Sequence, residues 1–102
     1  MDTDPKFYDR ADAHIHLSND QMSEVSRGKV SASMMYAAAR FNAWVSACGF
    51  DSRAEMAQSK GETLEYFVAE YRKMLEENLD EYIEKFDQHM KAKSASEANG
   101  DV

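Results

Sequence analysis

Residues 62–90 read ETLEYFVAEYRKMLEENLDEYIEKFDQHM, and this stretch decides the fold. Its apolar side chains recur at steps of three and four, with no glycine or proline between them. These side chains are Leu64, Phe67, Val68, Tyr71, Leu75, Leu79, Tyr82, Phe86 and Met90. Steps of three and four place side chains on one face of an α-helix. The sequence therefore predicts one long, unbroken amphipathic helix from Glu62 to Met90.

Three further helices are predicted before this one. Apolar residues at helical spacing indicate a helix from Pro5 to about Glu24, with Asp4 as its capping carboxylate. A second helix is expected from about Val30 to Cys48, and a short third one follows a cap at Asp51 or Ser52. The expected fold class is all-α: a small bundle of three main helices plus one short helix, with a long C-terminal helix.

The second helix has two different apolar sides. Large side chains dominate one face, which carries Val30, Met34, Ala37, Ala38, Phe41, Trp44, Val45 and Cys48. Small ones dominate the opposite face, which carries Ala32, Met35, Ala39, Ala43 and Ser46. A helix that is apolar on both sides can be covered on both sides. We therefore expect it to be the central helix, with a neighbour packed closely against its alanine face.

Length and composition indicate one domain in a reducing compartment. The 102 residues suit a single helical domain over residues 1–93, followed by a polar tail at 94–102 that we expect to be disordered. Cys48 has no second cysteine to pair with, which favours the cytoplasm. The acidic N-terminus does not resemble a signal peptide, and no apolar run is long enough to span a membrane.

Charge is distributed unevenly along this acidic chain. The net charge of −7 argues against nucleic-acid binding, which needs a basic face. Residues 26–50 nevertheless carry a net charge of +3, between a first segment of −4 at 1–25 and a last segment of −6 at 62–102. Either the basic middle packs against its acidic flanks, or it holds an anion.

The length of the last helix suggests a homodimer. Its 29 residues would span about 43 Å, whereas a compact domain of 100 residues is about 34 Å across. A projecting end would expose its apolar row, and a second copy could cover it. The candidate self-association residues are Asn78, Tyr82, Ile83, Phe86 and Met90. The alternative is that the first helix covers this row within one chain.

Two small polar clusters are candidate ligand sites. Ser26, Arg27 and Lys29 precede a helix N-terminus and, with Arg40, could bind a small anion. They lack the spacing of a phosphate loop, so the alternative is a capped turn with solvated cations. His16 has Asp12 and Asp20 one helical turn to either side, and whether these three bind a metal stays open.

The sequence offers no catalytic constellation. Cys48 has no histidine beside it in the sequence, and its place on the apolar face of the second helix indicates a buried thiol. We expect no enzyme activity, no cofactor and no metal centre.

The chain resembles a small proteobacterial family known as the domain of unknown function 3144 family. SRGKVSA followed by YAAARFNA carries the most specific part of the resemblance, which extends over roughly Pro5 to Phe86. The resemblance implies a helical, cytosolic protein from a bacterium, with no assigned activity and no catalytic residue. We therefore expect a cytoplasmic, non-enzymatic adaptor that self-associates and has an unknown protein partner. The alternative is a protein that binds a small anionic ligand at Ser26–Lys29.

Overall fold

The computed structural model describes residues 4–91, and these form helices and short turns without a strand. The helices are α1 (Phe7–Gln21), α2 (Arg27–Ala47), α3 (Arg53–Gln58) and α4 (Lys60–Glu84). A further helical segment follows at 86–91. The all-α class, with three main helices and one short one, is confirmed. The tail predicted at 94–102 lies outside the described residues.

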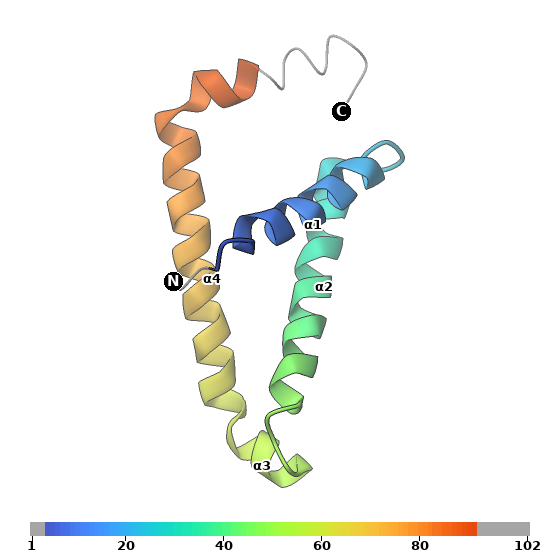
Figure 1. The fold of residues 1–102 in the computed structure, drawn as a ribbon, viewed down its shortest axis with the longest axis vertical. Coiled ribbons are helices and arrows are strands. Elements are labelled where there is room, and N and C mark those ends of the chain that lie inside the picture. Colours follow the sequence, from blue (N-terminus) through green and yellow to red (C-terminus); the bar gives the residue numbers. More distant parts are fainter. Residues whose placement is uncertain (1–3, 92–102) are drawn as a thin grey trace.

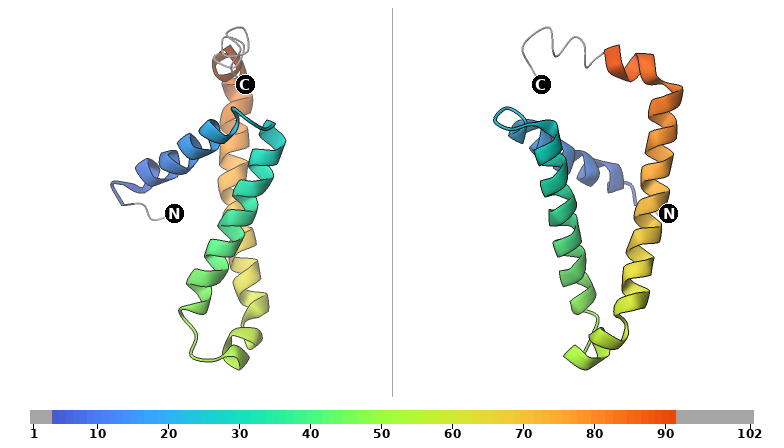
Figure 2. Two further views of the ribbon diagram at one scale, coloured as in Figure 1. Left: turned by 90° about the vertical axis from the view of Figure 1, so that its right-hand side faces the viewer. Right: turned by 180° about the vertical axis from the view of Figure 1, so that it is seen from behind.

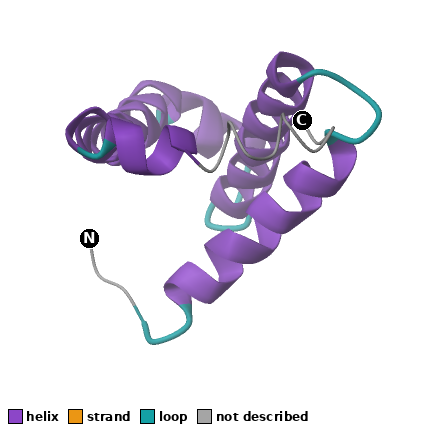
Figure 3. Cartoon of the chain, turned by 90° about the horizontal axis from the view of Figure 1, so that it is seen from above, coloured by secondary structure: helices purple, strands orange, loops and turns teal. Residues whose placement is uncertain are grey.

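The helices are arranged as an open V (Figure 1). α2 and α4 are the two arms of the V, and the short α3 is the corner between them. The arms separate with increasing distance from α3, as the view from behind also shows (Figure 2). The C-terminal end of α1 is joined to the free end of α2, and α1 projects out of the plane of the two arms (Figures 2 and 3). The molecule therefore measures 54 × 30 × 25 Å.

Two serines set the starts of α2 and α3. The Ser26 hydroxyl accepts a hydrogen bond from the Lys29 N–H at 3.4 Å, and the Ser52 hydroxyl accepts one from the Glu55 N–H at 3.1 Å. In return, the Glu55 carboxylate accepts a hydrogen bond from the Asp51 N–H at 3.3 Å. Such bonds satisfy N–H groups that have no partner within the helix.

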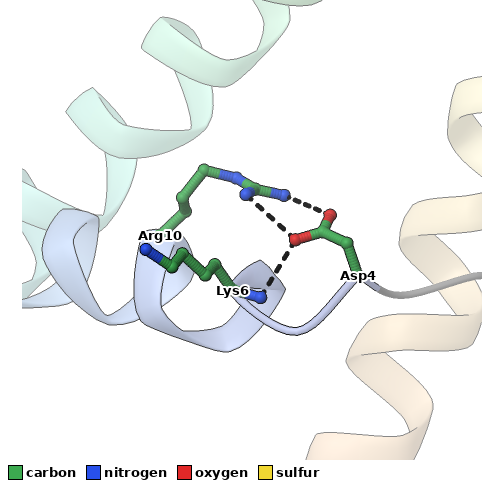
Figure 4. Close-up of polar contacts among 3 residues, drawn as sticks. All are labelled: Asp4, Lys6 and Arg10. Atoms are coloured by element: carbon green, nitrogen blue, oxygen red, sulfur yellow. Dashed lines mark hydrogen bonds and ion pairs between the residues drawn. The ribbon is translucent and has the colours of Figure 1, made fainter.

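The start of α1 differs slightly from the prediction. The helix begins at Phe7, and the Asp4 carboxylate accepts a hydrogen bond from the Lys6 N–H at 3.0 Å (Figure 4). The Arg10 guanidinium donates to both Asp4 carboxylate oxygens, at 3.1 and 2.7 Å. The hydrogen bonds from Arg10 and from the Lys6 N–H lower the pKa of Asp4 below its ordinary value. Asp4 therefore anchors the first turn of α1 from a position three residues before Phe7.

The prediction of one unbroken helix from Glu62 to Met90 is wrong at its C-terminal end. α4 ends at Glu84, and Lys85 leaves the helical conformation with φ −109° and ψ 32°. The segment 86–91 then runs off at an angle (Figure 1). In a straight helix His89 would lie about 10 Å beyond Tyr82 along the axis. Here the two rings stack with their centroids 4.0 Å apart, so this contact stabilises the bend.

A single chain has almost no interior. Val30 near the start of α2, where α1 and α2 meet, is 4% exposed and is the one buried residue in the described part. The radius of gyration is 17.2 Å, whereas a compact domain of this length has about 13 Å. The three main helices thus do not close on one another within one chain, because α3 holds α2 and α4 apart.

Candidate self-association surface

An apolar pocket lies between the arms of the V near α3. Its volume is about 640 Å³. Side chains from three helices line it, among them Ala39, Ala43 and Ser46 of α2, Met56 of α3, and Leu64 and Phe67 of α4. The alanine face predicted for the second helix therefore points toward α4. We call this set (Ala32, Met35, Ala39, Ala43 and Ser46) the inner face of α2.

The opposite side of α2 carries its larger side chains. We call Met34, Ala37, Phe41, Trp44 and Val45 the outer face of α2. Phe41 and Trp44 lie against each other with ring centroids 5.8 Å apart, yet they are 62% and 63% exposed. Met35 on the inner face is exposed as well. Apart from the buried Val30 and the half-buried Asn42 and Ser46, the residues of α2 are exposed.

The apolar row of α4 faces the same open space. Phe67 of this row is half-buried, as are Thr63 and Met74 elsewhere in α4. The rest of the row is exposed: Leu64, Val68, Tyr71, Leu75, Leu79 and Tyr82. α1, the element expected to cover this row in the alternative, packs on α2 instead. The row is therefore not covered by its own chain.

The five predicted self-association residues lie on both sides of the bend at Lys85. Asn78 donates a hydrogen bond to the Met74 carbonyl at 2.7 Å, so its amide is engaged within α4. Ile83 is 72% exposed, and Phe86 beyond the bend is 57% exposed. Tyr82 carries the stacked ring of His89, whose Nε2 lies 3.2 Å from a Glu81 carboxylate oxygen. Met90 is half-buried.

The two arms carry opposite charge that is not paired between them. α2 contains Arg27, Lys29 and Arg40 and no acidic residue, whereas α4 has a net charge of −5. The ion pairs found in the described residues join Arg10 to Asp4, Lys73 to Glu70, and His89 to Glu81. None of these three connects α2 to α4.

The residues predicted to bind an anion are not brought together as one group. Ser26, Arg27 and Lys29 form the start of α2, where the Ser26 hydroxyl is already engaged by the Lys29 N–H. Arg40 lies 13 residues beyond Arg27 on the same helix, which is about 20 Å along its axis. A ligand small enough for the turn would not reach Arg40.

The other candidate groups are dispersed over the surface. Within residues 4–91 there is no group of three or more His, Cys, Asp or Glu side chains placed to hold a metal. His16, Asp12 and Asp20 are all exposed on α1. Cys48 is exposed rather than buried, because its side of α2 is not covered by its own chain. In the described part, no helix is both long and apolar enough to cross a bilayer.

Comparison with known proteins identifies the family. Residues 7–83 match the model of a family described as "Protein of unknown function (DUF3144)". The chain belongs to the DUF3144 family. This confirms the predicted membership of the domain of unknown function 3144 family, and most of α1 to α4 lies within the match.

A solved structure has the same fold as this DUF3144 chain. The NMR structure of the protein NB7890A from Shewanella sp is 37% identical in sequence, with a TM-score of 0.73. The alignment covers 90% of this chain and 98% of that one. No protein of curated function matches the chain. The comparisons thus establish family and fold and assign no catalytic residue.

Proposed function

We propose that this DUF3144 protein is a non-enzymatic, cytoplasmic interaction protein whose chains associate with one another as homodimers. The observation that carries the proposal is the exposure of apolar side chains on both faces of α2 and along α4, with Val30 alone buried in the described part. Soluble monomers rarely leave contiguous apolar surface of this extent in water. A second copy is a symmetric way to cover it.

The size of the uncovered surface supports a dimer of the obligate kind. The chain exposes 8926 Å², of which residues 1–3 and 92–102 could contribute at most about 2,000 Å² as fully extended chain. A compact protein with the mass of the remainder exposes about 5,300 Å². Residues 4–91 therefore expose about 1,600 Å² more surface than a compact protein of the same mass. Two copies that cover this extra surface would together bury about 3,200 Å². Obligate homodimer interfaces bury about 2,000–5,000 Å².

The C-terminal residues are part of the proposed surface. Ile83 and Phe86 flank the bend at Lys85 and are among the exposed large apolar side chains. Burying two such side chains per copy offers about 3–6 kcal/mol of gross transfer free energy. The exposed Cys48 thiol is consistent with a reducing compartment, because a free surface cysteine is readily oxidised elsewhere.

Thermal unfolding at different protein concentrations tests this proposal. If folding is coupled to association, the unfolding midpoint rises with protein concentration. Phe86→Asp should lower the midpoint and reduce its concentration dependence, because a carboxylate would be buried in the interface. Tyr8→Asp is the matched control, since Tyr8 is an aromatic of similar exposure on α1 (66% against 57% for Phe86), outside the proposed surface. A midpoint independent of concentration in the unmodified chain would refute the proposal.

A further inference from the structure

Each face of α2 requires a different neighbour. The inner face is built of alanines, a serine and one methionine, so it suits a helix that approaches closely. The outer face carries Phe41 and Trp44, so it suits a helix that presents an apolar row. Only three of the 21 residues of α2 are charged, and a helix that is apolar around most of its circumference is normally buried.

The space between the arms is accessible from one end. α3 joins α2 to α4 at the corner, and the arms separate toward the free ends (Figures 1 and 2). Met35 on the inner face of α2 and Leu75 in the apolar row of α4 are both exposed. α1 lies out of the plane of the arms and does not enter it (Figure 3). The end opposite α3 is therefore open to an inserted helix.

We infer that this space is occupied by α2 of a second copy, with the two V-shaped chains facing each other open end to open end. This inference rests on the proposed self-association and specifies its geometry. By two-fold symmetry, each α2 enters the space between the arms of the other copy. The four arms then follow in the order α4, the partner's α2, α2, and the partner's α4.

This order gives every uncovered face a suitable neighbour. The two inner faces meet at the centre of the assembly, where alanines allow the helix axes to approach to about 8 Å. Each outer face, with Phe41 and Trp44, then lies against the apolar row of the partner's α4. The side of α4 that faces away from the partner's α2 stays in water. The faces that α3 holds apart within one chain are thus covered between chains.

The charges favour a second copy over an unrelated helix. In this arrangement α2 and the partner's α4 run in the same direction, because α2 enters the partner's V with its N-terminal end first and the partner's α4 begins at the corner of that V. Arg27 and Lys29 would lie near Glu62 and Glu65 at the start of that α4. Arg40, 13 residues further along, would lie near its middle, where Glu76 and Glu77 follow. The same chain carries both complementary surfaces, as an isologous interface requires.

Disulfide cross-linking between copies tests this geometry. In a Cys48→Ser background, single cysteines are introduced at Ala39 on the inner face and at Ala37 on the outer face. The two positions are matched, because both are alanines at nearly the same height on α2 and differ in the direction they face. Ala32→Cys and Ala43→Cys extend the scan by about two turns and one turn, to allow for the register of the two helices. Copper-catalysed oxidation is followed by non-reducing electrophoresis.

We expect at least one inner-face cysteine to form the dimeric disulfide about tenfold faster than Ala37→Cys, because a disulfide needs Cα atoms about 4.4–6.8 Å apart. A rate at Ala37→Cys that equals or exceeds every inner-face rate, or no cross-link at any position, would overturn the interlocked arrangement if the reduced protein is dimeric by light scattering. Self-association itself would then stand. A reduced, folded monomer would overturn both.

Discussion

Replacing Trp44 by alanine should weaken the dimer strongly. Trp44 is the one tryptophan of the chain and is 63% exposed on the outer face of α2. A tryptophan side chain buries up to about 250 Å², so about 150 Å² remains to be covered by a partner. At about 25 cal/mol per Å², covering it stabilises the dimer by about 4 kcal/mol per copy. An alanine side chain keeps a small part of this buried area, so we expect Trp44→Ala to lower the stability of the dimer by about 3 kcal/mol per copy.

Because a symmetric dimer contains the site twice, the loss is about 6 kcal/mol per dimer. That corresponds to an increase of about 10⁴-fold in the dissociation constant. Sedimentation equilibrium over a range of concentrations measures this constant. In the unmodified chain, Trp44 also reports association directly, since its fluorescence emission should shift to shorter wavelength when a partner covers the indole ring.

Tyr8→Ala provides the comparison for this substitution. Tyr8 is 66% exposed on α1, where its ring makes an edge contact with Phe7 at 5.0 Å. It lies outside the proposed surface, so its loss should change the dissociation constant by less than about threefold, as for an ordinary surface substitution. The reasoning is refuted if Trp44→Ala changes the constant by no more than Tyr8→Ala does.

Three further predictions concern charge, the bend and the first turn. Raising the salt concentration from 0.05 to about 0.5 M should weaken the dimer modestly, because charges between α2 and the partner's α4 are screened; unchanged affinity in sedimentation would contradict this. His89→Ala should lose a ring contact on Tyr82 of about 0.5–1.5 kcal/mol and speed amide hydrogen exchange in residues 86–91, while α4 stays protected; unchanged exchange at 86–91 would show that the stack does not hold the bend. The Asp4 carboxyl should titrate below its ordinary pKa of 3.8 when followed by NMR. Since the folded pKa is lowered, the stabilisation by Asp4 is present above that ordinary pKa and disappears as the pH falls through the lowered one. Arg10→Ala should raise this pKa, and a titration unaffected by that variant would disprove the assigned cause.

Local chemistry accounts for what could be predicted from the sequence. The capping serine at 52 places the start of α3, and the three-and-four spacing of apolar residues identifies α1, α2 and α4. Gly61 lies in the first turn of α4 rather than between helices, and Ser59 forms the junction between α3 and α4. Glycine lowers helix propensity without forbidding a helical conformation, so its position alone does not set a boundary.

The bend at Lys85 and the open V could not be predicted in the same way. No glycine or proline occurs between Glu84 and Met90, and the apolar spacing continues across the bend. The bend depends on His89 stacking on Tyr82, a contact that forms only after the helix has broken. The opening of the V depends on the direction that α3 gives to the two arms, which periodicity does not encode.

The candidate surface was predicted in part. Helical spacing correctly separated the small face of α2 from the large one, and the pocket near α3 is lined by the small face. The sequence also indicated the acidic and basic segments that form the two arms. It placed the self-association residues at the end of one straight helix, whereas Phe86 and Met90 lie beyond the bend. The direction of the chain after Lys85 was not predicted.

Multi-angle light scattering of the unmodified chain at several concentrations, with helix content followed by circular dichroism, tests the central claim most directly. The account predicts a particle of twice the 11.6 kDa chain mass wherever the protein is helical, and loss of helix content on dilution below the dissociation constant. A fully helical, stably folded species of 11.6 kDa at all concentrations would contradict it.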